Sequence, residues 1–204
     1  METPELTWKD VAISIRAVPG QREGCLSGLC GQLDGFGLDF SISYHRPGRT
    51  VPESYADALA TTGGRSWVLQ LEDDAILCRG FPTQAIRLLN SGRSLPLVSL
   101  YSGRRTGVPP LVPALEVLPG SRFLMAQGFF LRSDCVPDHN AFMLDFCRDR
   151  PFATDTATAA WMQARKLRFG RAWPSLVQHT PGPSLSHHAP HPNRFARYFY
   201  DPDC

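Results

Sequence analysis

Segments with strand-like and helix-like patterns alternate along the first half of the chain, and this alternation is the feature that most restricts the fold. Strand-like segments lie at 10–18, 37–45, 67–77 and 95–102, and the first of them is rich in β-branched residues. Helix-compatible segments lie between them at 22–33, 51–62 and 81–92. The pattern predicts an α/β fold with a mostly parallel central sheet and helices on both faces. A chain of 204 residues, 43% of them hydrophobic, suits a single domain with one sizeable core.

The second half of the chain is less regular. The stretch 102–113 holds three Pro and two Gly, so we expect a loop there and regard it as a candidate lid. Beyond this stretch the pattern favours strands at 122–132 and 171–179. It favours helices at 140–147 and 155–167.

Three consecutive carboxylates, Glu72, Asp73 and Asp74, interrupt the apolar run 67–77. If this run is one strand, Glu72 and Asp74 share one face near its carboxyl end and Asp73 lies on the other. Ligands of open α/β sheets bind outside the carboxyl ends of the strands. Two carboxylates there suit a hard divalent cation, which in turn can hold a diphosphate. The alternative is a solvated strand end whose acids pair with arginine.

The run LEDDAI after the third predicted strand resembles the acidic metal-binding motif of GT-A-fold (Rossmann-like) glycosyltransferases, in particular bacterial and viral types with a Leu-Glu-Asp-Asp signature. SIRAVPGQRE is similar to that family's first nucleotide-binding strand and loop, and PESYADALATTGGRSWVLQLEDD to the helix that leads into the acidic motif. AQGFFLR resembles the segment that lines the acceptor side. PSLVQH is similar to a late strand that ends in a metal-ligating His.

The resemblance spans roughly residues 10–186. It implies a single GT-A-like domain over 1–186 and a basic, aromatic C-terminal tail over 187–204. Within the domain it implies a donor-binding half at about 10–102 and an acceptor half at about 115–186.

The activity that the resemblance implies is transfer of a sugar from a nucleotide-diphosphate sugar, with UDP-glucose as the expected donor, to an acceptor hydroxyl. Negative charge grows on the departing diphosphate, and a divalent metal neutralises it without proton transfer. The expected metal ligands are Glu72, Asp74 and His179, which makes Asp74 a catalytic residue as well. These ligands favour Mn²⁺ or Mg²⁺, with Mn²⁺ first because imidazole is a poor partner for Mg²⁺.

Donor binding is expected from residues of the first-strand loop, the acidic motif and the acceptor-side segment, namely Arg16, Val18, Pro19, Arg22, Arg65, Glu72, Asp73 and Gln127. Guanidinium groups suit a diphosphate because they donate paired hydrogen bonds. Surface charge is the alternative reading of the three arginines. Asp155 is the candidate general base for the acceptor hydroxyl, and a helix N-cap is the alternative role for it.

The segment 161–200 contains six Arg or Lys, four His and no Asp or Glu, although the net charge of the chain is only +2. Together with SGRRTG and the aromatic RFARYFY, this basic end suits phosphate contacts and base stacking. We therefore expect the acceptor to be a 5-hydroxymethyl-pyrimidine in double-stranded DNA, as in phage enzymes that glycosylate modified bases. The alternative acceptor is a lipo-oligosaccharide or another cell-surface glycan.

Several classes of protein are disfavoured. The sequence has no run of 18 apolar residues, and its charged N-terminus is not a secretory signal, so we expect a cytoplasmic protein without a membrane span. Six scattered cysteines without a CxxC pair indicate reduced thiols. A nucleotide-sugar pyrophosphorylase needs a Gly-rich loop with a Lys, which AVPGQREG lacks. A non-catalytic α/β nucleotide-binding module stays open as an alternative.

Overall fold

The computed structural model describes residues 4–103, 107–123, 127–150, 154–180 and 196–200. Its centre is a seven-stranded sheet in the order β2-β1-β3-β7-β5-β8-β6. These strands are β1 (Val11–Ala17), β2 (Ser41–Tyr44), β3 (Trp67–Glu72), β5 (Leu97–Ser99), β6 (Ala114–Pro119), β7 (Gly128–Arg132) and β8 (Arg168–Trp173). A second, two-stranded sheet joins β4 (Ala75–Leu77) to β9 (Val177–His179).

The central sheet is mostly parallel, as the alternating pattern predicts. Strand β1 runs parallel to both β2 and β3. Strand β7 is antiparallel to β3 and to β5, so β3 and β5 point the same way. Strand β8 is parallel to β5, and only β6 and β7 run against the others.

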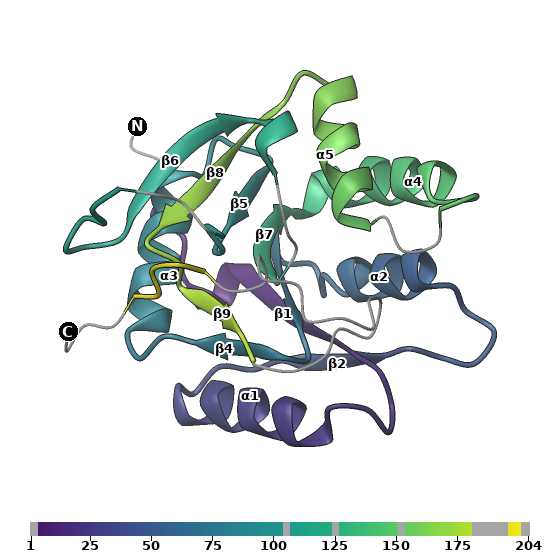
Figure 1. Cartoon of the computed structure of the whole chain (residues 1–204), viewed down its shortest axis with the longest axis horizontal. Coiled ribbons are helices and arrows are strands. Elements are labelled where there is room, and N and C mark those ends of the chain that lie inside the picture. Colours follow the sequence, from purple (N-terminus) through teal and green to yellow (C-terminus); the bar gives the residue numbers. More distant parts are fainter. Residues whose placement is uncertain (1–3, 104–106, 124–126, 151–153, 181–195, 201–204) are drawn as a thin grey trace.

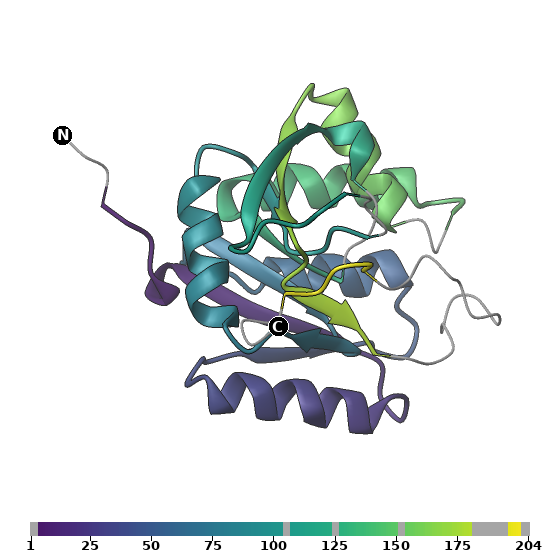
Figure 2. The same ribbon diagram turned by 60° about the vertical axis from the view of Figure 1, so that its left-hand side comes forward.

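Helices cover both faces of this sheet (Figures 1 and 2). They are α1 (Glu23–Gly35), α2 (Val51–Ala60), α3 (Phe81–Ser91), α4 (Val136–Phe146) and α5 (Thr154–Ala164). Buried residues of α1 and α3 share one hydrophobic cluster, and those of α2, α4 and α5 share a second. Short 3-10 turns at Trp8–Asp10, Gly120–Arg122 and Ser133–Cys135 complete the described elements. The predicted α/β fold class is therefore confirmed.

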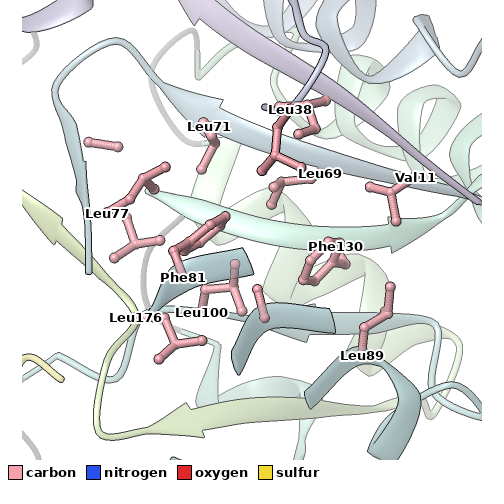
Figure 3. Packing of buried hydrophobic residues seen from close by; sticks show 14 of the residues in the cluster. Val11, Leu38, Leu69, Leu71, Leu77, Phe81, Leu89, Leu100, Phe130 and Leu176 are labelled. Carbon is pink, nitrogen blue, oxygen red and sulfur yellow. The ribbon is translucent and has the colours of Figure 1, made fainter. Parts of the chain in front are cut away.

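Strand alternation divides the core between the two faces. Leu69 and Leu71 of β3 belong to the cluster with α1 and α3, whereas Val68 belongs to the cluster with α2, α4 and α5. Figure 3 shows Leu69 and Leu71 with Phe81 of α3 and Phe130 of β7 in the first cluster. Each such side chain contributes about 1.5–3 kcal/mol to the stability of the folded state when it is fully buried. The apolar residues of the strands therefore stabilise the packing of the sheet against its helices.

Two predicted strands differ from the observed ones. The run 67–77 is divided into β3 and β4 by a turn at Asp73 and Asp74, and the run 171–179 is divided into β8 and β9. In both cases the second piece leaves the central sheet, and the two pieces pair with each other, with Ala75 opposite His179. Period-2 patterning cannot reveal such a change of sheet, because the residues on either side of the break are equally apolar.

Strand β6 was not predicted from the sequence. It forms the edge of the central sheet and pairs antiparallel with β8. The Pro-rich loop predicted at 102–113 precedes it, and residues 104–106 of that loop lie outside the described residues. Val108 and Leu111 in the described part of the loop are each 93% exposed. The role of the loop as a lid stays a prediction.

Part of the C-terminal tail packs on the domain. The side chain of Gln178 donates to the Ala196 carbonyl and accepts from the Ala196 N–H, at 3.1 and 2.9 Å. Ser175 exchanges backbone hydrogen bonds with the neighbours of Phe199 on either side. Residues 196–200 therefore lie beside the segment that carries His179, while 187–195 and 201–204 of the predicted tail lie outside the described residues.

Candidate functional site

The acidic residues lie at the carboxyl ends of β1 and β3. Strand β3 ends at Glu72, and the chain turns at Asp73 and Asp74 before β4 begins. This turn overturns the expectation that Asp73 faces away from its neighbours, because Asp73 and Asp74 both reach the same guanidinium, that of Arg22. The cluster still lies where ligands of open α/β sheets bind.

Asp74 is the centre of the cluster. Its Oδ2 accepts from Nη1 of Arg22 and lies 3.0 Å from Nε2 of His179. All three side chains are largely shielded from water, with 3% exposure for Asp74, 4% for His179 and 16% for Arg22. The pairing of β4 with β9 produces this contact, since it places His179 opposite Ala75, the next residue after Asp74.

The tautomer of His179 is set by its other nitrogen. Nδ1 lies 2.8 Å from the backbone carbonyl of Thr180, which can only accept, so Nδ1 carries a proton. In the neutral imidazole, Nε2 therefore presents a lone pair to the Asp74 carboxylate, and two acceptor atoms face each other. A proton or a metal ion between them removes the conflict. A His that donates its second N–H to a carbonyl is the usual arrangement around a metal ligand.

Asp73 ties the first strand to the acidic turn. Its Oδ2 accepts from the N–H of Val18 at 3.1 Å, and its Oδ1 lies 3.4 Å from Nη1 of Arg22. Burial raises the pKa of Asp73 above its usual value, although the Val18 N–H and Arg22 act in the opposite direction. Pro19 follows in the exposed turn that leads into α1. The first-strand loop and the acidic motif, which sequence analysis assigns to one site, are thus in direct contact.

Glu72 faces a different partner. Its Oε2 accepts from Nη2 of Arg16 at 2.9 Å, and the two residues are cross-strand neighbours on β3 and β1. Burial works against the charge on Arg16, but the adjacent Glu72 carboxylate outweighs it and the pKa of Arg16 is raised. The guanidinium lies over the ring of Tyr55, 5.8 Å from its centroid. Among the described residues, Nε of Arg16 is buried without a hydrogen-bond partner.

Gln127 and Asp155 lie around this Glu72–Arg16 pair. The backbone carbonyl of Gln127 accepts from the N–H of Glu72 at 3.2 Å, and its buried Oε1 has no hydrogen-bond partner in the described part of the chain. Asp155 is the second residue of α5, and its charge acts on buried Tyr55. Burial, with Glu72 and Asp155 adding to it, raises the pKa of Tyr55 well above its usual value. Buried polar groups are normally hydrogen-bonded, so the side chains of Arg16 and Gln127 are candidates for binding a ligand.

A divalent cation fits part of the predicted ligand set. Two cis ligands at about 2.1 Å from an octahedral ion are about 3.0 Å apart, which is the separation of Asp74 Oδ2 and His179 Nε2. Glu72 is held by Arg16, so the predicted set of three is not brought together. Within the described residues, no group of three His, Cys, Asp or Glu is arranged to hold a metal. Mg²⁺-type sites usually need only one or two carboxylates, since water and substrate phosphates supply the rest.

Comparison with known proteins identifies the fold. No protein-family model matches the sequence, and no curated protein matches it. Among solved structures, a glycosyltransferase involved in the glycosylation of the major capsid of PBCV-1 matches with a TM-score of 0.60 at 12% identity, over 86% of this chain and 95% of that one. This chain shares its fold with that glycosyltransferase.

A second solved structure with a similar fold is S. aureus TarS 1-349. It matches with a TM-score of 0.57 at 11% identity, over 83% of this chain and 60% of that one. The same protein in complex with UDP-GlcNAc matches with a TM-score of 0.54 at 12% identity, over 87% of this chain and 60% of that one. At such identities the likeness concerns the fold alone.

Arg65 lies outside the acidic cluster at the carboxyl end of β3. It precedes β3 and its Nη1 donates to the carbonyl of Lys9, which precedes β1. Because β1 and β3 are parallel, these residues are at the amino ends of the strands, opposite Asp73 and Asp74. The prediction that Arg65 binds phosphate with the acidic cluster is therefore wrong. Arg65 is close to the acidic motif in the sequence but lies at the opposite end of β3.

Three of the described arginines of the basic end have partners within the protein. Arg165 pairs with Asp138 at 2.7 Å, and Arg171 pairs with Glu116 at 2.8 Å. Arg168 donates to the carbonyl of Val117 at 3.1 Å. The count of basic residues in 161–200 overlooked these acidic partners, which lie earlier in the sequence.

One further side chain lies next to the Glu72–Arg16 pair. Tyr55, which the sequence does not single out, lies under the guanidinium of Arg16 and donates to Oε1 of Gln70 at 3.1 Å. An aromatic residue on the buried face of a helix gives no signal in the sequence that distinguishes it from other core residues.

Among the described residues, no helix is both long and apolar enough to cross a bilayer.

Proposed function

We propose that this protein transfers a sugar from a nucleotide-diphosphate sugar to an acceptor hydroxyl. The observation that carries the proposal is the convergence of Asp74, His179 and Arg22 at the carboxyl end of β3. A carboxylate and an imidazole suited to a cation adjoin a guanidinium suited to a diphosphate, in a glycosyltransferase fold.

The proposed donor is a UDP-sugar. TarS 1-349, which shares the fold, has been solved with UDP-GlcNAc, and this supports a uridine nucleotide here as well. Arg16 and Gln127 supply a buried N–H donor and a buried oxygen acceptor without partners among the described residues. In the proposal, these two groups bind the ribose and the sugar, and Arg22 with the loop at Val18 and Pro19 binds the diphosphate. UDP-glucose is the first hexose to test.

The proposed cofactor is Mn²⁺, or Mg²⁺ in its place. When bound, it supplies positive charge to the departing diphosphate. Asp74 and His179 would hold it, and the Thr180 carbonyl keeps the His179 lone pair directed to the ion. Asp73 holds the first-strand loop against this corner through Val18. Glu72 acts in the proposal by orienting Arg16 rather than as a metal ligand.

Asp155 is the proposed general base for the acceptor hydroxyl. It lies in the first turn of α5, close enough to Tyr55 for its charge to act on that phenol, and Tyr55 in turn supports Arg16. The acceptor would therefore approach from the side of α5, next to the donor sugar. An inverting transfer requires such a base because the attacking oxygen must lose its proton.

For the acceptor we propose a glycan hydroxyl rather than a base in DNA. DNA binding by the basic end requires arginines that are available to phosphates, but Arg165 and Arg171 are paired with Asp138 and Glu116. A hydroxymethylated pyrimidine in DNA remains the second acceptor to test. A non-catalytic nucleotide-binding module is the third possibility, and it predicts binding without turnover.

The test is a screen of labelled UDP-sugars against three acceptors, with and without EDTA. The acceptors are a lipo-oligosaccharide, a capsular or wall glycan, and duplex DNA containing 5-hydroxymethylcytosine or 5-hydroxymethyluracil. We expect label on a glycan, lost with EDTA and restored by Mn²⁺. Label on DNA alone would reverse the choice of acceptor. Binding of UDP-sugar without transfer or hydrolysis in any arm would refute the enzymatic function.

A further inference from the structure

Arg22 occupies an unusual backbone conformation directly beside the acidic pair. It precedes the first residue of α1 and has φ +54° and ψ +29°, in the left-handed region that is costly for a residue with a Cβ. The neighbouring Gly20 also has a positive φ, of +70°. A strained position that carries a charged side chain points to a role for that side chain.

The guanidinium of Arg22 lies where a metal ion would also act. Nη1 binds Oδ2 of Asp74, the same oxygen that lies 3.0 Å from Nε2 of His179. A second cation bridging Asp74 and His179 would share this oxygen with Arg22. Two positive charges at contact distance in a water-poor corner repel strongly. The present position of Arg22 and a filled site between Asp74 and His179 are therefore competing states.

Arg16 provides the contrast. It is also buried and paired with an acid, but its guanidinium is fixed between Glu72 and the ring of Tyr55 within the sheet. Arg22 lies in the turn between β1 and α1, where a change of side-chain rotamer moves no strand. Of these two arginines, only Arg22 contacts the proposed metal ligand, and it does so from a turn rather than from a strand.

We propose that Arg22 is an exchangeable counter-cation. In the empty site it neutralises Asp73 and Asp74. When the divalent ion takes Asp74 and His179, Arg22 turns to the donor diphosphate, which then balances its charge. This inference rests on the proposed function, because it assumes a diphosphate donor. It makes ion and donor binding cooperative, and thermodynamic linkage requires the cooperativity to be reciprocal.

Binding measurements without turnover test the exchange. Mn²⁺ affinity is measured by EPR and calorimetry, with and without UDP, for the wild type and for Arg22→Gly, Arg22→Asn and Arg22→Lys. Gly and Asn tolerate the left-handed backbone and remove the charge, so both variants are expected to fold, whereas Lys keeps the charge. Arg49→Ala is the matched control, because Arg49 pairs with Asp57 on the exposed surface of α2.

The exchange predicts that removing the charge of Arg22 strengthens Mn²⁺ binding and weakens UDP binding. Arg22→Gly and Arg22→Asn should bind Mn²⁺ alone about 10-fold more tightly than the wild type, bind UDP in the presence of Mn²⁺ more weakly, and lose most of the cooperativity. Arg22→Lys should resemble the wild type for Mn²⁺, and Arg49→Ala should match the wild type throughout.

Three outcomes would overturn the exchange. They are Mn²⁺ affinity that is unchanged or reduced in Arg22→Gly and Arg22→Asn, independent binding of Mn²⁺ and UDP to the wild type, and no Mn²⁺ binding by any variant. The first two outcomes leave the proposed function intact, and the third also removes Mn²⁺ as its cofactor while leaving sugar transfer to be decided by the donor screen. Failure of the wild type to bind any UDP-sugar would instead remove the proposed function itself.

Discussion

Oδ2 of Asp74 lies 3.0 Å from Nε2 of His179, although the two residues are far apart in the sequence. Neither residue reaches the other through the central sheet. The contact exists because β4 and β9 leave that sheet and pair with each other, Ala75 opposite His179. The proposed cation site thus depends on a small second sheet next to the carboxyl end of β3.

Asp74→Asn tests the acidic corner. An amide oxygen binds a divalent ion weakly and no longer balances the charge of Arg22, so we expect the transfer rate to fall by about 100-fold or more. The thermal unfolding midpoint should change little, because Asp73 still pairs with Arg22. Asp57→Asn, which alters the exposed pair with Arg49, is the control and should keep full activity. Full activity of Asp74→Asn would remove Asp74 from the chemistry.

His179→Gln tests the second proposed ligand. Loss of the imidazole should raise the Mn²⁺ concentration needed for half-maximal rate by about 10-fold or more, and saturating Mn²⁺ should restore part of the rate. The measurement is a Mn²⁺ titration of the initial rate at saturating donor. A titration curve that coincides with that of the wild type would assign His179 a purely structural role.

Gln127→Leu should separate activity from stability. Leu keeps the volume of the side chain and removes a buried Oε1 that has no hydrogen-bond partner among the described residues. We expect the free energy of unfolding to rise by about 1 kcal/mol, and kcat/KM for the donor to fall by about 10-fold, if Oε1 accepts from the sugar. Urea denaturation and steady-state kinetics measure the two effects. A loss of stability with unchanged kinetics would contradict the prediction.

A pair of glycine substitutions tests the packing. A Cβ on Gly120 would lie 2.3 Å from Cβ of Met162, so Gly120→Ala should lower the free energy of unfolding by about 1–3 kcal/mol. A Cβ on Gly28, on the exposed side of α1, would meet no atom of another described element within 4 Å. Gly28→Ala should therefore raise stability by about 0.5–1 kcal/mol, since Ala favours the helix. Urea denaturation of both variants decides whether α5 packs as closely on Gly120 as described.

His139 predicts a pH dependence of stability. It is fully buried against Trp161, and burial lowers its pKa to about 4, against the opposing effects of Asn140 and Asp138. The unfolded chain takes up this proton near pH 6.5, whereas the folded protein takes it up only near pH 4. Stability is therefore full above about pH 6.5 and is lost as the pH falls towards 4, by roughly 2–3 kcal/mol.

The measurement is the free energy of unfolding between about pH 4 and 8 for the wild type and His139→Gln. The variant should show a shallower decline below about pH 6.5, and the two curves should run parallel above about pH 7. Equal slopes in the acidic range would show that His139 does not titrate on unfolding. Absolute stability is not compared, because the substitution also alters packing against Trp161.

Much of the fold follows from the sequence, because it depends on local patterns. Alternating apolar segments predict the strands that became β1, β2 and β3, and the segments between them predict α1, α2 and α3. The acidic run also predicts a site at the carboxyl end of a strand, and the structure places Glu72, Asp73 and Asp74 at that end of β3.

Pairing partners and side-chain directions were decided by the tertiary structure. The sequence gives no reason to prefer Arg16, Arg22 or Arg65 as a partner of the acidic residues. In the structure, strand direction brings Arg16 to Glu72 and leaves Arg65 at the amino ends of β1 and β3. A two-residue turn gives Asp73 and Asp74 a common partner where strand alternation would have separated them. Local sequence patterns predict whether a residue is buried. Contacts between distant segments depend instead on how helices and strands pack together. That packing is why a carboxylate early in the chain meets an imidazole near its end.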